Sequence, residues 1–162
     1  MRQPALLCDA LAVAAKITAP DLYGRKYCKM VLLRVDQCLR QRPATAGVID
    51  KATVEHVLPQ SSTDASWLAA FPDAAQRSEL VDSLGNLLLL SGARNSSASN
   101  WDFNTKKVRY LSDGKSQQVL QSPFAITNSV LLEENKWTPE VIRRRTEDFW
   151  RCCGTRTAGI FE

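Results

Sequence analysis

Four consecutive leucines, Leu87–Leu90, restrict the possible folds of this chain more than any other feature of the sequence. Turn-forming pairs flank the run, a Gly-Asn before it and a Ser-Gly after it. A continuous apolar stretch of about four to eight residues between turn signals is typical of a strand buried inside a domain. We therefore predict a buried strand at this position.

A second β-prone stretch, Thr53–Val57, lies before a long insertion that leads to the leucine run. The insertion contains a short helical pattern at Trp67–Phe71. Beyond the leucine run, Ala93–Leu111 is polar but contains no helix breaker, and Trp101 is one of its apolar anchors. The predicted order in this part of the chain is strand, long loop, strand and helix. Its tryptophans are expected to be core anchors rather than stacking platforms for bases.

Amphipathic helices are predicted on both sides of this central part. Apolar residues recur every three to four positions over residues 21–42, and the same rhythm runs over residues 6–17. Near the C-terminus, Trp137–Glu140 reads Trp-Thr-Pro-Glu, which is the layout of a helix start. Threonine is a preferred N-cap and proline a preferred first helical residue.

These patterns predict a mostly helical α+β protein in which helices surround a small ββα unit. The 162 residues are about the size of one domain. We expect N-terminal helices (1–50), a ββα region with a long inserted loop (51–111) and a C-terminal helical part (112–162).

Composition excludes several classes of protein. No apolar run approaches the ~20 residues of a membrane span. The five cysteines include no CxxC pair, which favours reduced thiols over a zinc ribbon. The net charge of +4 permits contact with phosphates but is far below that of a histone-like binder.

The dipeptide Glu55-His56 has the clearest chemical potential in the chain. His56 is the only histidine, so mechanisms that need two are excluded. Adjacent strand residues point to opposite faces, and these two share a site only if a twist or a bound cation brings both to it. Glu55 would then bind a hard cation while His56 activates water. On the dipeptide alone, a solvated glutamate beside a core histidine is an equally good interpretation.

Further short motifs occur in a fixed order along the chain, beginning with this dipeptide. Residues 55–60 read Glu-His-Val-Leu-Pro-Gln, residues 84–87 read Leu-Gly-Asn-Leu, and Asn95 opens the predicted helix. A Phe-x-x-Lys at 103–106 and a Trp…Ile-x-x-Arg at 137–145 follow. Over about residues 27–149, the chain resembles the HNH, or ββα-metal, nucleases. The resemblance is closest to the C-terminal nuclease domain of GmrSD-type modification-dependent restriction enzymes, including phosphorothioate-sensing relatives. The Pro-Gln continuation is also similar to the HNH domain of CRISPR RNA-guided nucleases.

The resemblance implies a role for each of four residues. His56 would be the general base that deprotonates the attacking water, and Glu55 would be an acidic metal ligand. Asn95 takes the place of the last ligand, although it could be only an N-cap, and Asn100 is its nearest rival. Asn86 would hold the loop that carries His56 and orient the imidazole, although it could merely cap a turn. Oxygen ligands of this kind favour Mg²⁺ or Mn²⁺ over zinc.

Three basic residues are candidate contacts for nucleic acid. Lys106 is the lysine of the Phe-x-x-Lys motif, and Lys107 follows it on the predicted helix. A phosphate contact is the functional interpretation of this pair, and a solvated helix surface is the alternative. Arg145 matches the arginine at the family's last helix, where a structural contact is as expected as a DNA contact.

The implied function is metal-dependent hydrolysis of a DNA phosphodiester, which nicks one strand and leaves 5′-phosphate and 3′-hydroxyl ends. By analogy the domain would be the effector of a bacterial, cytoplasmic anti-phage system that restricts modified DNA. An N-terminal nucleotide-hydrolysing sensor domain, separate or linked, would be its partner. The chain itself contains no GxxxxGK[ST] loop. The alternatives are a catalytically idle DNA-binding or assembly module of the same fold and an RNase that uses the same motif.

Overall fold

The computed structural model describes residues 12–40, 50–61, 63–91, 100–111, 121–133 and 136–157. Residues 12–17 are helical. The elements that follow, in chain order, are η1 (Leu22–Gly24), α2 (Cys28–Leu39), β1 (Ala52–His56), α4 (Ala65–Ala70), α5 (Ala74–Leu80), η2 (Leu84–Asn86), β2 (Leu87–Ser91), α7 (Phe103–Leu111), α8 (Ala125–Glu133) and α9 (Pro139–Thr157). Within these ranges, none of the helices has both the length and the apolar composition of a membrane span.

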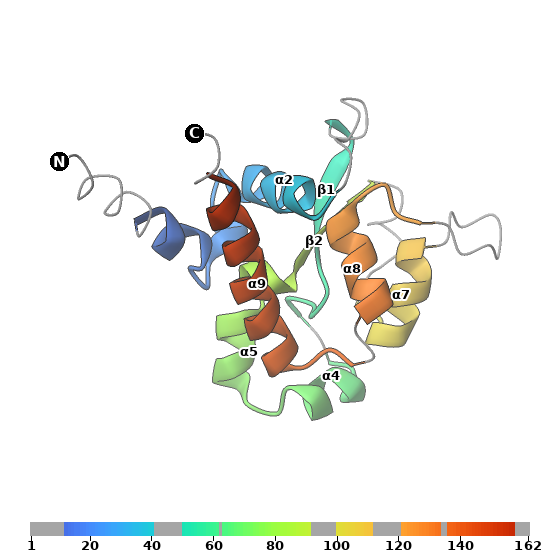
Figure 1. Cartoon of the computed structure of the whole chain (residues 1–162). Coiled ribbons are helices and arrows are strands. Elements are labelled where there is room, and N and C mark those ends of the chain that lie inside the picture. Colours follow the sequence, from blue (N-terminus) through green and yellow to red (C-terminus); the bar gives the residue numbers. More distant parts are fainter. Residues whose placement is uncertain are drawn as a thin grey trace.

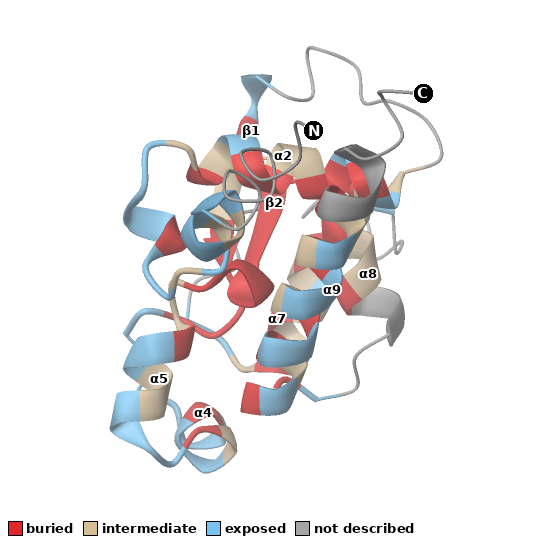
Figure 2. Ribbon diagram, turned by 60° about the vertical axis from the view of Figure 1, so that its left-hand side comes forward, coloured by how far each residue is buried: buried red, intermediate tan, exposed pale blue. Residues whose placement is uncertain are grey.

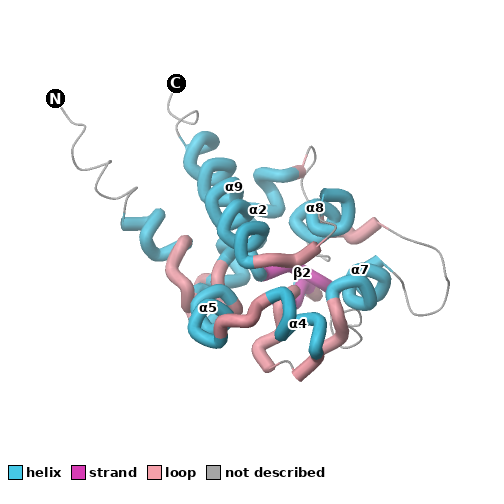
Figure 3. The backbone as a smooth tube through the Cα atoms, turned by 90° about the horizontal axis from the view of Figure 1, so that it is seen from below, coloured by secondary structure: helices cyan, strands magenta, loops and turns pink. Residues whose placement is uncertain are grey.

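The sheet consists of two antiparallel strands at the centre of the molecule (Figure 1). Ala52 of β1 faces Ser91 of β2, and His56 faces Leu87. Seen from below, α2, α7, α8 and α9 surround β2, and α4 and α5 lie on the near side (Figure 3). The chain is therefore a mostly helical α+β protein, as the sequence predicts.

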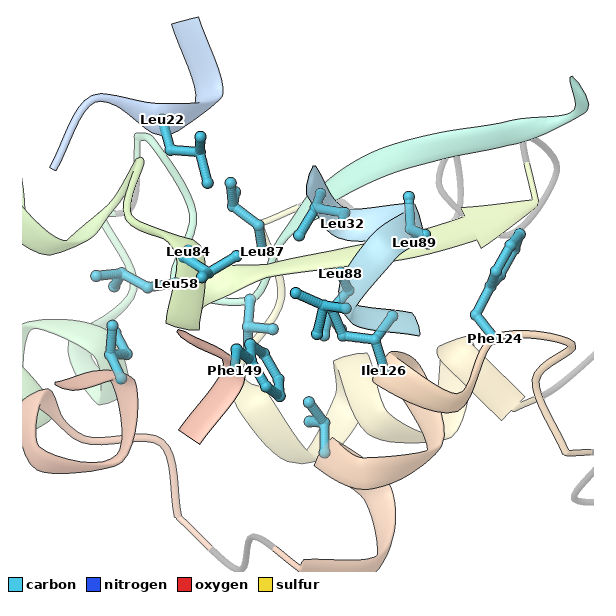
Figure 4. Close-up of a cluster of buried hydrophobic side chains, with 14 of the residues drawn as sticks. Leu22, Leu32, Leu58, Leu84, Leu87, Leu88, Leu89, Phe124, Ile126 and Phe149 are labelled. Atoms are coloured by element: carbon cyan, nitrogen blue, oxygen red, sulfur yellow. The ribbon is translucent and has the colours of Figure 1, made fainter. Parts of the chain in front are cut away.

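The core forms around the leucines of β2, which are fully buried (Figure 2). Leu32 of α2, Ile126 of α8 and Phe149 of α9 lie around this strand (Figure 4). The hydroxyl of Thr127 in α8 donates to the carbonyl oxygen of Leu89 at 2.5 Å. A main-chain acceptor of β2 is thus bonded by a covering helix, on the side where the described residues form no further strand. A buried carbonyl oxygen requires such a partner.

The joint between η2 and α9 requires a glycine. A Cβ built on Gly85 would lie 2.0 Å from the carbonyl oxygen of Ile142, well inside van der Waals contact. The amide of Gly85 also donates to Oγ1 of Thr146 at 3.0 Å. The Leu-Gly-Asn motif is thereby pressed directly against the backbone of α9.

The predicted helices differ from the observed ones mainly at their ends. The helix predicted over residues 93–111 is described as α7 from Phe103 onwards, because Asp102 caps it by accepting from the amides of Asn104 and Thr105 at 3.0 and 3.1 Å. Residues 92–99 lie outside the described ranges. Trp101 is 49% exposed, so the prediction that it anchors the core is wrong.

Candidate active site

His56 is the last residue of β1 and leads into the inserted segment. Its Nε2 lies 2.8 Å from Oδ1 of Asp82, in the turn between α5 and η2. The side-chain amide of Gln60 donates to the same oxygen at 3.0 Å. The ring of Tyr23 packs edge-on against the imidazole, with 4.2 Å between the ring centroids. Segments that are far apart in the sequence therefore meet at this one ring.

Asp82 determines which imidazole nitrogen carries the hydrogen. A carboxylate accepts hydrogen bonds, so the neutral ring holds its hydrogen on Nε2, and Nδ1 keeps its lone pair. Burial lowers the pKa of His56 below its ordinary value of 6.5, and the hydrogen bond to Asp82 opposes this shift. The ring is consequently neutral at pH 7, and no described residue forms a hydrogen bond with Nδ1. A neutral ring with an accepting nitrogen is the state required of a general base.

Glu55, the neighbour of His56, has a different set of partners. Its Oε1 accepts from Nζ of Lys106 at 2.8 Å and from the hydroxyl of Tyr110 at 3.1 Å, both on α7. The same ammonium group donates to the carbonyl oxygen of His56 at 2.6 Å. Alternation along β1 therefore separates the two side chains, as expected for adjacent strand residues. Lys106 links them, because it bonds to the side chain of one and the main chain of the other.

The Glu55–Lys106–Tyr110 cluster lies in the interior. Lys106 is 1% exposed, and burial lowers the pKa of its ammonium while Glu55 raises it. Burial and the charge of Glu55 raise the pKa of Tyr110 well above 10. Removing one partner of a buried ion pair leaves an uncompensated charge, which is strongly destabilising. The cluster therefore ties α7 to β1.

The carboxylate oxygens of Glu55 are ligands of the kind that a hard cation prefers. Both of its hydrogen bonds to described residues use Oε1, which leaves Oε2 for a metal ion. Asn95, the expected second ligand, lies outside the described residues, and Asn100 is an exposed turn residue. In the part of the chain that the structure describes, no three His, Cys, Asp or Glu side chains cluster around a metal-sized site. A single carboxylate of this kind would suit a hard cation such as Mg²⁺, which would take its other ligands from waters and phosphate.

Asn86 fastens the segments on either side of the His56–Asp82 pair and is fully buried. Its amide donates to the carbonyl oxygens of Leu58 at 3.0 Å and Val81 at 2.7 Å. Its Oδ1 accepts from the amide of Leu58 at 2.8 Å and from the indole of Trp137 at 3.0 Å. Asn86 therefore bonds to the loop after His56 through both its amide nitrogen and its Oδ1. The orientation of the imidazole itself comes from Asp82.

The residues predicted to contact nucleic acid lie in two different environments. Arg145 is 3% exposed, donates to the carbonyl oxygen of Gly85 at 3.0 Å, and lies over two aromatic rings. Like Lys106, it is bound to the protein interior, and an expected contact with phosphate does not fit these two positions. Lys107 is half-buried, with its ammonium 4.8 Å from the ring centroid of Phe103. It stays a candidate for a phosphate contact.

Sequence reasoning missed three residues of this site. Tyr110 lies one helical turn after Lys106, so its place on the same face of α7 could have been read from the spacing. Asp82 and Tyr23 carry no such signal. They reach His56 only because the insertion folds back and η1 packs beside it: the amide of Tyr23 donates to the carbonyl oxygen of Asp82 at 3.1 Å.

Comparison with known proteins identifies the family of this chain. Residues 12–151, most of the chain, match a family model described as GmrSD restriction endonucleases, C-terminal domain. A comparison with curated proteins finds no match. Because the matched region contains β1, the insertion, β2 and the helices from α2 to most of α9, the family assignment covers the whole site. The chain belongs to the family formed by the C-terminal domain of GmrSD restriction endonucleases.

Proposed function

We propose that this domain is a Mg²⁺- or Mn²⁺-dependent DNA endonuclease that nicks one strand, with His56 as its general base. The observation that carries the proposal is the His56–Asp82 pair, which presents a neutral imidazole at the end of β1 in a restriction endonuclease family. The HNH classification, the metal and the nicking activity are parts of the proposal.

In the proposed reaction, Nδ1 of His56 takes a proton from the attacking water. Asp82 keeps the ring in the required tautomer and stabilises the imidazolium that forms. Asn86 keeps the loop and the Asp82 turn in place through its bonds to Leu58 and Val81. The phosphodiester is hydrolysed to a 5′-phosphate and a 3′-hydroxyl.

Glu55 would hold the cation through Oε2, with Asn95 as the second protein ligand. A bound Mg²⁺ or Mn²⁺ would neutralise charge on the scissile phosphate and on the leaving oxygen. Lys106 and Tyr110 fix the other carboxylate oxygen, so the direction of Oε2 is set before any ion binds. Lys107 is the proposed contact for a neighbouring phosphate, at a half-exposed position on α7.

The proposed setting is a bacterial cytoplasmic system that restricts modified phage DNA, in which this domain cuts. Its proposed partner is an N-terminal nucleotide-hydrolysing sensor domain, either linked to it or separate. The family's description as the C-terminal domain of restriction endonucleases supports a larger assembly.

The test is conversion of supercoiled plasmid to open circles with Mg²⁺ or Mn²⁺. Nicking by the wild type that disappears in EDTA and in His56→Ala supports the proposal. Folding of the variant is checked by its circular dichroism spectrum and melting temperature. DNA binding without nicking, unchanged in His56→Ala, would identify an idle binding module. An RNA substrate offered in the same assay decides between DNase and RNase activity.

A further inference from the structure

A hollow of about 360 Å³ lies beside the His56–Asp82 pair. It is built by the inserted segment between β1 and η2, and its walls include Pro59, Gln60, Trp67, Ala74, Arg77 and Val81. The segments that form it are the loop after β1 and the short helices α4 and α5, which lie together at the lower end of the molecule (Figure 1). In the proposed reaction, Asn86 bonds to the main chain of two wall residues, Leu58 and Val81, and the side chains of the walls have no role.

Two residues make the hollow continuous with the candidate active site. Gln60 lines it and donates to Oδ1 of Asp82, the oxygen that also binds His56. Val81 lines it and directly precedes Asp82 in the chain. A strand with its phosphate at His56 would therefore place an adjoining nucleotide at the mouth of the hollow.

The chemistry of the walls suits a nucleobase. Apolar side chains, among them Pro59, Trp67 and Val81, supply apolar contact surface, while an amide and several hydroxyls supply hydrogen-bonding groups. One wall residue, Arg77, is cationic, and none of the wall residues is a carboxylate. Its guanidinium is held in place by donation to the carbonyl oxygen of Phe71. Walls of this kind can bind a neutral, polar ring, and they contain no negative charge that would repel the phosphate attached to it.

The size of the hollow agrees with the same occupant. Ligand pockets span about 300–1,000 Å³, and this one lies at the lower end of that range. It has room for a single base with its sugar and not for a duplex. A base enters such a space only after it has left the stack, as happens in single strands and in enzymes that evert a nucleotide.

We propose that this hollow binds one unstacked base of the strand that is cut, next to the scissile phosphate. The inference rests on the proposed nuclease function for the identity of the ligand. Gln60 then has two contacts, one with Asp82 and one with the bound base, and so connects base recognition to the position of the imidazole.

The test fills the hollow with a side chain and leaves the active-site residues intact. Ala74→Trp projects an indole from a wall residue, whereas Ala75→Trp adds the same side chain at the next position of α5, which is also exposed and does not line the hollow. Ser78→Trp, one turn further along α5, is a second filling variant. Melting temperatures establish that all three variants fold.

Binding is measured by fluorescence anisotropy in EDTA, where no strand is cut. The probes are a mixed-sequence single-stranded oligonucleotide of about twelve nucleotides and an oligonucleotide of equal length that lacks all bases. The wild type and Ala75→Trp should bind the first about tenfold more tightly than the second, since a stacked base contributes on this scale. In Ala74→Trp and Ser78→Trp that preference should disappear while binding of the abasic strand stays the same.

The inference is overturned if the wild type binds both probes equally tightly. It is also overturned if Ala74→Trp and Ser78→Trp keep the wild-type preference for the base-containing probe. Plasmid nicking by the same proteins separates this result from the proposed function. If the wild type nicks plasmid but binds both probes equally, the base site is contradicted and the proposed nuclease function is not. The wild type could instead prefer the base-containing probe, lose this preference in the filling variants, and fail to nick plasmid. This result supports the base site and contradicts the proposed nuclease function.

Discussion

Asp82 gives the imidazole of His56 its orientation through one hydrogen bond of 2.8 Å. Without it, the ring would keep its place in the loop but not its tautomer, since either nitrogen could then carry the hydrogen. This single carboxylate therefore distinguishes a positioned base from a merely buried histidine.

Asp82→Asn should lower nicking about tenfold to a hundredfold, the usual effect of losing a residue that orients a functional histidine. It should also lower the pKa of His56 further, because Asp82 raises that pKa against the effect of burial. The rate comes from plasmid nicking and the pKa from an NMR titration of the single histidine. Glu79→Gln, which neutralises an exposed carboxylate on α5, is the control and should change neither. A His56 pKa that rises in Asp82→Asn would contradict this account.

Lys106→Met should destabilise the protein by about 3–5 kcal/mol, because Glu55 would then be buried without its cation. The double variant Lys106→Met/Glu55→Gln should recover a large part of that loss, since it removes both charges. Urea denaturation gives the unfolding free energies. Lys107→Met, at the neighbouring half-buried position, is expected to cost less than about 1 kcal/mol. If Lys106→Met and Lys106→Met/Glu55→Gln had equal unfolding free energies, the unpaired charge of Glu55 would not be the cause of the destabilisation, and the account would be contradicted.

At this scale, the sequence predicts residues that belong to short motifs and misses their distant partners. The Glu-His and Leu-Gly-Asn motifs point to His56 and Asn86, and the structure has Asn86 at the end of η2, bonded to Leu58 in the loop after His56. Asp82 was not identifiable, because 26 positions of insertion separate it from His56. The burial of Lys106 was also hidden, since one lysine on a helix has no pattern that shows which face it takes.

Among the elements, the contact of η2 with α9 depends on the absence of a side chain at Gly85. Gly85→Ala should destabilise the protein by about 3 kcal/mol or more, because a backbone carbonyl occupies the space and overpacking cannot be relieved by rotating a side chain. Gly24→Ala is the matched control, since a Cβ there would meet nothing within 4 Å. Thermal melts of the two variants provide the comparison, and equal melting temperatures would contradict the predicted crowding.

The elements themselves were predictable where one signal dominates. The leucine run became β2, and the Thr-Pro-Glu start became α9, where the amide of Val141 approaches Oγ1 of Thr138 at 3.4 Å. The helix α5 was missed although Asp73 caps it by accepting from the amide of Ala75 at 2.8 Å. A short helix within an insertion has too few residues to show a periodic pattern.

At the scale of the whole molecule, closure of the helices around the sheet also encloses thiols. Burial raises the pKa of Cys28 to about 11 and that of Cys153 to about 12. Only the thiolate is a nucleophile, so both should be alkylated slowly at pH 9, where an ordinary thiol with a pKa of 9.0 is half ionised. Cys152, which is half-buried beside Cys153, should react faster. Mass spectrometry after iodoacetamide treatment measures the rates, and equal rates at these positions would contradict a closed core.

The overall arrangement was predictable because a strand of four leucines must be covered, and the flanking amphipathic helices supply the cover. How the insertion folds was not predictable, because its path is set by contacts such as that of the Trp67 indole with the carbonyl oxygen of Trp101 at 3.0 Å. Such contacts join distant parts of the chain and leave no periodic trace in the sequence.

Chemical rescue of His56→Gly by imidazole tests the central claim most directly. If His56 is the general base, this variant should nick plasmid at least about a hundredfold more slowly than the wild type. Imidazole added to the buffer should restore part of the rate, because it supplies the missing base at the vacated position, and it should not rescue Glu55→Gln. Nicking by His56→Gly at the wild-type rate, without imidazole, would contradict the account.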